Sequence, residues 1–277
     1  MDLRGVPGIY NKALQPQWDV MTRVVSNLVQ QAGVRTIYLE GSLARGTADA
    51  HSDVDLLVGL DSNAMRDIWT HRHQITNIPL PAILDLNHQW GDPAAFSYAV
   101  LYENGVYLDL TFVESPHVPT SHAVVLWSSS HHGPDGDRPP EPAMDVHPDP
   151  MDDALRLFWM GSPLCAKYLV RNQLWTALWF IESRRTLFLK AWRLAHAPAR
   201  ADWSWSKVHE DLPKTVLDDL AKTVTLLEYP ALAQSLVDLM TMMQHHGPQL
   251  AQTYGMAYPE GPATSVAHMV SRMLGLE

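Results

Sequence analysis

The sequence predicts an α/β domain with a mixed sheet, followed by an all-α domain built as a helical bundle. Up to about residue 127, short runs of β-branched and aromatic residues alternate with amphipathic segments. Beyond residue 150, apolar residues recur at three- and four-residue spacing, which is typical of packed helices. Residues 128–150 are rich in Pro, Gly, Ser and Asp, a composition that interrupts regular structure. We therefore expect domains at 1–127 and 151–277, joined by a proline-rich linker at 128–150.

Apolar spacing defines the first elements of the N-terminal domain. Residues 15–33 carry valines and a leucine at helical spacing, and Gly33 is the expected stop. A second helix is expected over residues 61–73, with Asp61 or Ser62 as its N-terminal cap. Strands are expected where β-branched and aromatic residues gather: 34–40, 53–60, 80–86 and 122–127.

The clearest supersecondary element is a β-hairpin over residues 96–113. Two alternating runs meet there at Glu103-Asn104-Gly105, a sequence that suits a hairpin turn. The C-terminal half contributes helical segments at 150–198, 212–227, 230–246 and 263–275.

Charge and composition narrow the class of partner. The formal net charge is −10, and the first 150 residues hold 18 acidic and 8 basic residues. A protein that follows a nucleic-acid backbone would need a basic face, so we expect no nucleic-acid polymer as partner. An acidic half instead favours metal ions and small cationic molecules. The sequence shows no apolar run long enough for a bilayer and no signal-peptide pattern, so we expect a cytoplasmic protein without a membrane partner.

Three aspartates are expected to meet on one face of the sheet. Asp53 and Asp55 are two positions apart in a strand, so both side chains point to the same face. Asp109 alternates in the same way with Leu108 and Leu110 in the hairpin, and the three carboxylates converge if the two strands are neighbours. A divalent cation relieves the repulsion between them, and Mg²⁺ is held by one or two carboxylates with a substrate phosphate.

A Gly-Ser pair ten residues upstream supplies the second part of this pattern. Gly41 allows a close backbone approach, and Ser42 with the following amides can bind a phosphate at the start of a helix. A triphosphate held there would lie beside a metal bound by the aspartates, as nucleotidyl transfer requires. Without this pair, Asp53 and Asp55 would be explained as the start of a strand and a solvated edge residue.

These motifs give the chain a family resemblance. The stretch GSLARGTADAHSDVDLLV, with a later strand Asp, resembles the DNA polymerase β-type nucleotidyltransferase superfamily. The stretch YENGVYLDLTFV is similar to the hairpin of streptomycin 6-adenylyltransferases and lincosamide nucleotidyltransferases. The resemblance covers about residues 37–113, and a looser likeness extends to the helices through AKYLVRNQLWTALWFIESRRTLFLKAW and WSWSKVHEDLP.

The resemblance implies a nucleotidyltransferase that uses Mg²⁺ and transfers AMP from ATP to a hydroxyl of a small, cationic, aminoglycoside-type molecule. Asp53 and Asp55 would bind Mg²⁺, and Gly41 and Ser42 would hold the ATP phosphates. Asp109 would complete a second metal site or act as the base for the acceptor hydroxyl. Other carboxylates nearby in the sequence leave the identity of that base open: Asp85, Glu103 and Glu114.

Basic residues offer further nucleotide contacts, each with a simpler explanation beside it. Arg45 either contacts phosphate or forms a salt bridge with a local aspartate. Lys167 and Arg171 share one helix face, where they either neutralise the departing pyrophosphate or lie in solvent. Lys207, in the turn-like stretch SWSKVHE, is a third residue of the same kind.

The remaining chemistry-bearing residues suggest packing rather than a second site. Cys165 is the single cysteine and is expected to be a small buried hydrophobe. The histidine pairs lack a recognisable ligand spacing, so no zinc site is expected. A buried helical stripe is expected from four tryptophans: Trp159, Trp175, Trp179 and Trp192.

Other interpretations remain open at this level. The Gly-Ser and Asp-x-Asp spacing also resembles minimal nucleotidyltransferase antitoxins, which modify a partner protein, although the helical half would then be unexplained. A nucleotide-binding protein without activity is disfavoured because three clustered carboxylates are costly without a metal. A lincosamide or a biosynthetic intermediate as acceptor, a nucleotide other than ATP, and a homodimer are also compatible with the sequence.

Overall fold

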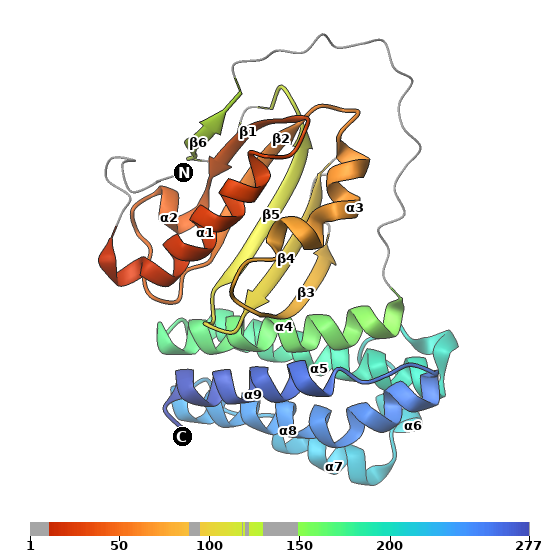
Figure 1. Ribbon diagram of the computed structural model, residues 1–277. Coiled ribbons are helices and arrows are strands. Elements are labelled where there is room, and N and C mark those ends of the chain that lie inside the picture. Colours follow the sequence, from red (N-terminus) through yellow and green to blue (C-terminus); the bar gives the residue numbers. More distant parts are fainter. Residues whose placement is uncertain (1–10, 89–94, 118, 120–121, 130–148, 277) are drawn as a thin grey trace. The chain divides into compact units, whose positions relative to one another are not determined.

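The computed structural model describes residues 11–88, 95–117, 119, 122–129 and 149–276. The chain divides into two compact units, Met1–His147 and Pro148–Glu277. Figure 1 shows a sheet with helices in the first unit and helices alone in the second. The linker expected at residues 128–150 lies almost entirely outside the described residues. Among the helices that are described, none combines the length and the apolar content needed to cross a membrane.

The described part of the first unit contains a mixed sheet in the order β3-β4-β5-β2-β1-β6. The two central strands, β2 and β5, pair in parallel, and the other neighbouring strands pair antiparallel. Parallel neighbours require a crossover connection, which here runs through a helix and two strands. The strands are β1 (Val34–Leu39), β2 (Val54–Leu60), β3 (Ala82–His88), β4 (Phe96–Tyr102), β5 (Tyr107–Glu114) and β6 (Val124–Ser128).

Helices α1 (Gln15–Leu28) and α3 (Met65–Thr76) lie across the same face of this sheet (Figure 1). Side chains from both helices form one core with alternate residues of the central strands, such as Leu56 and Leu110. Leu56 is 2% exposed and Leu110 is fully buried, so each contributes roughly 1.5–3 kcal/mol through burial. Because side chains alternate along a strand, the intervening residues of β2 and β5 point to the face opposite α1 and α3.

The helix boundaries correct two expectations about the first unit. Asp61 does not cap α3, because its carboxylate accepts a 2.6 Å hydrogen bond from Nε of Arg35 instead. The helix begins at Met65, after an N-cap residue, Ala64, that makes no side-chain capping bond. Helix α1 ends at Leu28, before the expected stop. Gly33, at φ +84°, instead turns the chain into β1, and its carbonyl accepts the Asp61 N–H at 2.8 Å.

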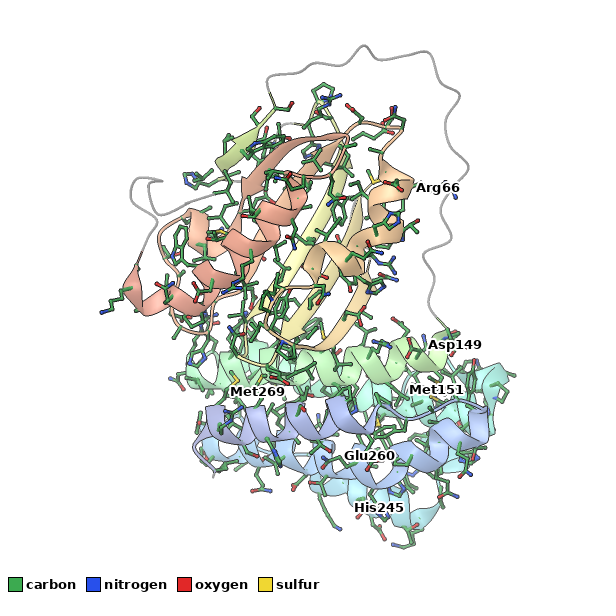
Figure 2. The ribbon with its side chains drawn as sticks, viewed as in Figure 1. Arg66, Asp149, Met151, His245, Glu260 and Met269 are labelled. Carbon is green, nitrogen blue, oxygen red and sulfur yellow. The ribbon has the colours of Figure 1, made fainter. Side chains whose placement is uncertain are left out.

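The second unit is a bundle in which α4 packs against α5, α8 and α9. Asp149 caps the start of α4, accepting a 2.9 Å hydrogen bond from the backbone N–H of Met151 (Figure 2). Within the described residues, the helices of this unit are α4 (Pro150–Val170), α5 (Leu174–His196), η3 (Pro198–Arg200), α6 (Val208–Asp211), α7 (Lys214–Lys222), α8 (Tyr229–Tyr254) and α9 (Glu260–Leu274).

The expected stripe of buried tryptophans is wrong for two of its members. Trp159 is fully buried and Trp192 is half-buried, but Trp175 is 75% exposed and Trp179 is 59% exposed. The buried face of α5 instead contains Ala177 and Ile181. These lie two positions from the tryptophans, close to half a turn around the helix. A four-residue spacing therefore identified one helix face without telling which face is buried.

Cys165 is buried as expected. Its thiol lies 3.5 Å from the carbonyl of Ala177, and burial raises its pKa to about 12. A thiol with that pKa stays protonated at neutral pH, so it does not serve as a nucleophile.

Candidate active site

Two aspartates stand side by side on neighbouring strands. Asp55 in β2 and Asp109 in β5 are partners in the parallel register of these strands. Neighbouring strands lie about 4.8 Å apart, so the two side chains share one place on the sheet face opposite α1 and α3. The flanking residues Val54, Leu56 and Leu108 are buried in the core on the other face. The strand pairing therefore brings together two carboxylates that are far apart in the sequence.

Gly41 brings the backbone against the same carboxylate. Its φ is +65°, and a Cβ built on it would lie 1.8 Å from Oδ2 of Asp55. A side chain at position 41 would therefore meet both a left-handed backbone and the carboxylate. The neighbouring Glu40 N–H donates a 2.9 Å hydrogen bond to the Asp55 carbonyl, which extends the β1–β2 pairing up to the turn.

The Gly-Ser turn opens a short helix, α2 (Gly41–Ala44). The N–H groups of its first turn have no acceptor within the helix, and they carry a partial positive charge that favours an anion. Ser42 accepts a 3.0 Å hydrogen bond from the Thr47 N–H through its carbonyl, which folds the following loop back on the turn. Arg45 ends α2, and its side chain is exposed.

The loop that leads to Asp53 is held by polar contacts. The Asp49 carboxylate accepts the His51 N–H at 2.9 Å, and the Ser52 N–H donates to the Asp49 carbonyl at 3.0 Å. Gln17 of α1 reaches the loop and donates to the carbonyl of Ser52 at 3.2 Å. Asp53 follows this loop directly and precedes the first residue of β2. The loop thus fixes the point at which the Asp-x-Asp motif begins.

The other carboxylates that could act as the base do not lie beside Asp55. Asp85 belongs to the helix-covered face, where it accepts a 2.7 Å hydrogen bond from Tyr98 and lies 3.2 Å from Nδ1 of His73. Burial, and then the Asp85 charge, raise the pKa of Tyr98, so this phenol stays protonated. Glu114 lies at the far end of β5, paired with the last residue of β2, and Glu103 lies in the exposed hairpin turn. Asp109 is thus the carboxylate that β5 places beside Asp55.

The three predicted cations of the helical unit come from two segments. Lys167 and Arg171 lie at the end of α4, where Lys167 is buried with its ammonium 5.4 Å from the ring centre of Tyr168. Lys207 precedes α6 and donates a 2.6 Å hydrogen bond to Glu210. The contacts described within this unit do not join Lys207 to the α4 pair.

Glu40 is a further residue beside the Asp55–Asp109 pair, and the sequence motifs did not single it out. It directly precedes Gly41, has an extended backbone and lies next to Asp55 through the β1–β2 pairing. The alternation of β1, in which Leu39 faces the core, would have placed Glu40 on the same face as Asp55. The signal was present, but it needed the register between two strands.

The donor set suits a metal ion that is shared with a substrate. Among the described residues, no three His, Cys, Asp or Glu side chains are arranged to hold a metal ion by themselves. Mg²⁺ commonly uses one or two protein carboxylates and takes its other ligands from water and phosphate. The pair Asp55 and Asp109, with Asp53 just before β2, fits that requirement.

A mixed sheet with paired aspartates beside a Gly-Ser turn is the arrangement expected for a nucleotidyltransferase. A family model described as streptomycin adenylyltransferase matches residues 15–273. The chain therefore belongs to the streptomycin adenylyltransferase family and is an adenylyltransferase. Among solved structures, it is similar to an aminoglycoside 6-adenyltransferase from Bacillus subtilis, with 16% identity and a TM-score of 0.40 over 91% of this chain and 97% of that chain. The search of curated proteins gave no match.

Proposed function

We propose that this adenylyltransferase transfers AMP from ATP to a hydroxyl of a small, cationic, aminoglycoside-type antibiotic and releases pyrophosphate. The observation that carries the proposal is the register pair Asp55 and Asp109 beside the Gly41 turn, in a chain whose family is described by the adenylylation of streptomycin. The acidic first half of the chain supports a cationic acceptor, because it attracts amine-rich molecules.

The roles divide between the turn and the strands. The first-turn amides at Gly41 and Ser42 would bind the phosphates, because they point donors at an anion. Asp53 and Asp55 would hold Mg²⁺, which would neutralise charge on the phosphates during transfer. Asp109 would share this metal or accept the proton of the acceptor hydroxyl. The acceptor oxygen forms a bond to the α-phosphorus, the bond from that phosphorus to the β-phosphate oxygen breaks, and pyrophosphate leaves.

Lys167, Arg171, Lys207 and Arg45 remain predicted nucleotide contacts in this proposal. Each would neutralise phosphate charge, and the proposal does not depend on all four. A substitution to glutamine at any one of them should raise the KM for ATP more than the KM for the acceptor, because the missing charge would face the nucleotide.

The first experiment is mass spectrometry of an aminoglycoside and lincosamide panel incubated with the protein, ATP and Mg²⁺. We expect one compound to gain the mass of an AMP group, and we expect no gain with Asp55→Asn. Labelling of a protein instead of any compound would favour the antitoxin-like alternative. If the folded protein binds Mg-ATP but modifies no compound and no protein, the proposed acceptor class is wrong.

A further inference from the structure

Two cations and one carboxylate meet at the surface of the helical unit. The ammonium of Lys207 lies 2.6 Å from Oε1 of Glu210, and Nη1 of Arg200 lies 3.5 Å from Oε2 of the same carboxylate. The exposed fractions of the side chains are 52% for Lys207, 31% for Arg200 and 56% for Glu210. One carboxylate thus occupies the space between two cations that solvent can reach.

The backbone that carries these cations is held in an unfavourable conformation. Ser204 and Lys207 have φ values of +50° and +62°, although neither is glycine. Residues other than glycine adopt this left-handed region only when the surrounding structure imposes it, and such residues cluster at functional sites. The segment 200–207 therefore has a shape that its local sequence does not favour.

One buried arginine imposes that shape. Arg193 of α5 is fully buried, and its guanidinium donates to the carbonyls of Ser204 and Ser206, on either side of Trp205. Its Nε also donates to Oδ2 of the fully buried Asp211 at 2.8 Å. These three contacts fix the chain immediately before Lys207 and immediately after Glu210.

Arg200 is held by the same buried carboxylate. Its Nη2 lies 2.7 Å from Oδ1 of Asp211, an ion-pair contact whose angles do not make a hydrogen bond. Its guanidinium also lies 5.9 Å from the ring centre of Trp203. With Nη2 directed at Asp211, Nη1 is directed at Glu210. The structure thus orders two cations toward one point, which an isolated surface salt bridge does not require.

The two cations are groups of the kind that bind phosphate. A guanidinium supplies planar paired donors and an ammonium supplies a compact charge, and both are common phosphate ligands in proteins. A carboxylate between them imitates two phosphate oxygens but carries a single negative charge, fewer than a polyphosphate carries. The pKa of Glu210 lies below its usual value, chiefly because Lys207 donates a hydrogen bond to its carboxylate. Glu210 is therefore ionised at neutral pH, where it would compete with an incoming anion.

We propose that Arg200 and Lys207 form a subsite for the polyphosphate of the nucleotide, and that Glu210 is an internal carboxylate which occupies this subsite until the polyphosphate displaces it. The inference rests on the proposed function for the identity of the ligand, a nucleoside triphosphate or the released pyrophosphate. Glu210 then weakens binding of the polyphosphate, because its carboxylate must be displaced before the polyphosphate can bind.

The test is calorimetric titration of the full-length protein with sodium tripolyphosphate as the probe. Glu210→Gln is expected to tighten binding by about two- to fivefold, the size of an exposed charge interaction. Lys207→Gln and Arg200→Gln are expected to weaken binding by about tenfold, because each removes a charge-assisted hydrogen bond to the probe. Tightening by removal of a charge distinguishes a competing carboxylate from a structural one.

Lys214 and Asp218 provide matched controls. They form an exposed ion pair at 2.6 Å on α7, so Lys214→Gln and Asp218→Asn make the same charge changes within the same unit. Both are expected to leave the affinity for tripolyphosphate within about twofold of the unmodified protein, because the pair is exposed and screened. The double variant Glu210→Gln with Lys207→Gln should lose most of the gain seen with Glu210→Gln alone, since the two charges are coupled.

Each outcome decides the proposal. The proposal is wrong if Glu210→Gln binds tripolyphosphate no more tightly than the unmodified protein does. It is also wrong if Lys207→Gln loses no more affinity for tripolyphosphate than Lys214→Gln loses. If Arg200→Gln fails to fold, the Glu210 and Lys207 variants still decide, because their side chains are half exposed. A protein that transfers AMP yet shows no Glu210 effect would refute this subsite and leave the proposed function standing. A protein in which Glu210→Gln tightens binding of tripolyphosphate, but which does not transfer AMP, would support this subsite and refute the proposed function.

Discussion

The two units position their charged groups by different means. In the first unit, backbone pairing places Asp55 beside Asp109, because the parallel register of β2 and β5 fixes both. In the second unit, a buried side chain, Arg193, places Lys207 by holding the carbonyls before it. A register is an all-or-none property of a sheet, whereas an arginine contact can be removed by one substitution. The carboxylates should therefore tolerate mutation of their surroundings better than the cations do.

The strongest test of the first unit is Asp55→Asn. The amide has nearly the same shape but no charge, so we expect kcat/KM for AMP transfer to fall by about a thousandfold with little change in the unfolding midpoint. Steady-state kinetics with the acceptor found by mass spectrometry would measure this. Glu114→Gln, at the far end of β5, is the control and should retain activity. Equal losses in both variants would contradict the assignment of the site to one end of the strands.

The strongest test of the second unit is Arg193→Met. Methionine can fill part of the space, but it leaves the fully buried Asp211 without its principal partner. Loss of one member of a buried ion pair costs about 3 kcal/mol or more, which we expect in the free energy of unfolding measured with urea. Arg156→Met is the control, because the Arg156–Asp152 pair on α4 is part exposed and should cost less than about 1 kcal/mol. Equal costs would mean that Arg193 does not hold the loop.

Gly41→Ala separates the effect of the backbone from that of the carboxylate. Its methyl group would lie within 2 Å of Asp55 Oδ2 on a left-handed backbone, so we expect about a hundredfold loss of activity and about 2 kcal/mol of destabilisation. Gly255→Ala is the matched control, because Gly255 has φ +100° but no atom within 4 Å of a built Cβ. Gly255→Ala should be destabilised by the backbone effect alone and keep its activity. Full activity of Gly41→Ala would show that the turn does not need to lie against Asp55.

The smallest expected effect is a pH dependence of stability at His246 on α8, next to His245 (Figure 2). Burial, and then the neighbouring His245, lower the pKa of His246, and these causes outweigh the opposite effect of Asp219. Asp219 lies 3.8 Å away, too far for a hydrogen bond. Because the unfolded chain binds the proton more readily, this contribution to stability is present above pH 6.5 and is lost as the pH falls below it.

Thermal unfolding of the protein and of His246→Phe, followed between pH 7.5 and 5, would measure this contribution. Phenylalanine fits an environment that already contains the rings of Phe188 and Trp192. The variant should lose less stability on acidification than the unmodified protein does. An identical pH profile would show that His246 titrates in the folded state as it does in the unfolded chain.

Local patterns in the sequence predicted most elements of the first unit. The β4–β5 hairpin turns where Asn104-Gly105 predicted, with Gly105 at φ +83° and the Asn104 side chain accepting the Val106 N–H at 3.1 Å. The cap of α3 was not predicted, because the long-range contact between Arg35 and Asp61 overrode a local preference. The pairing of Asp55 with Asp109 was expected only on condition that their strands were neighbours, since the sequence carries alternation but no strand order.

The charged loop of the second unit could not be predicted in the same way. Nothing near Arg193 in the sequence indicates that its guanidinium reaches Ser204 and Ser206, because a helical pattern locates a face without naming its partners. Glu210 carried a weak signal, since it follows Lys207 by three positions at the start of a helix. The exposure of Trp175 was missed for the same reason, because the four-residue spacing did not specify which side of α5 meets the bundle.

The parallel pairing of β2 and β5 also has a consequence for folding. Parallel strands cannot be joined by a tight turn, and the chain between residues 55 and 109 contains α3, β3 and β4. Contacts between distant parts of a chain form slowly, because the intervening loop must first be closed. We therefore expect the two aspartates, which repel each other, to be brought together in a late step of folding.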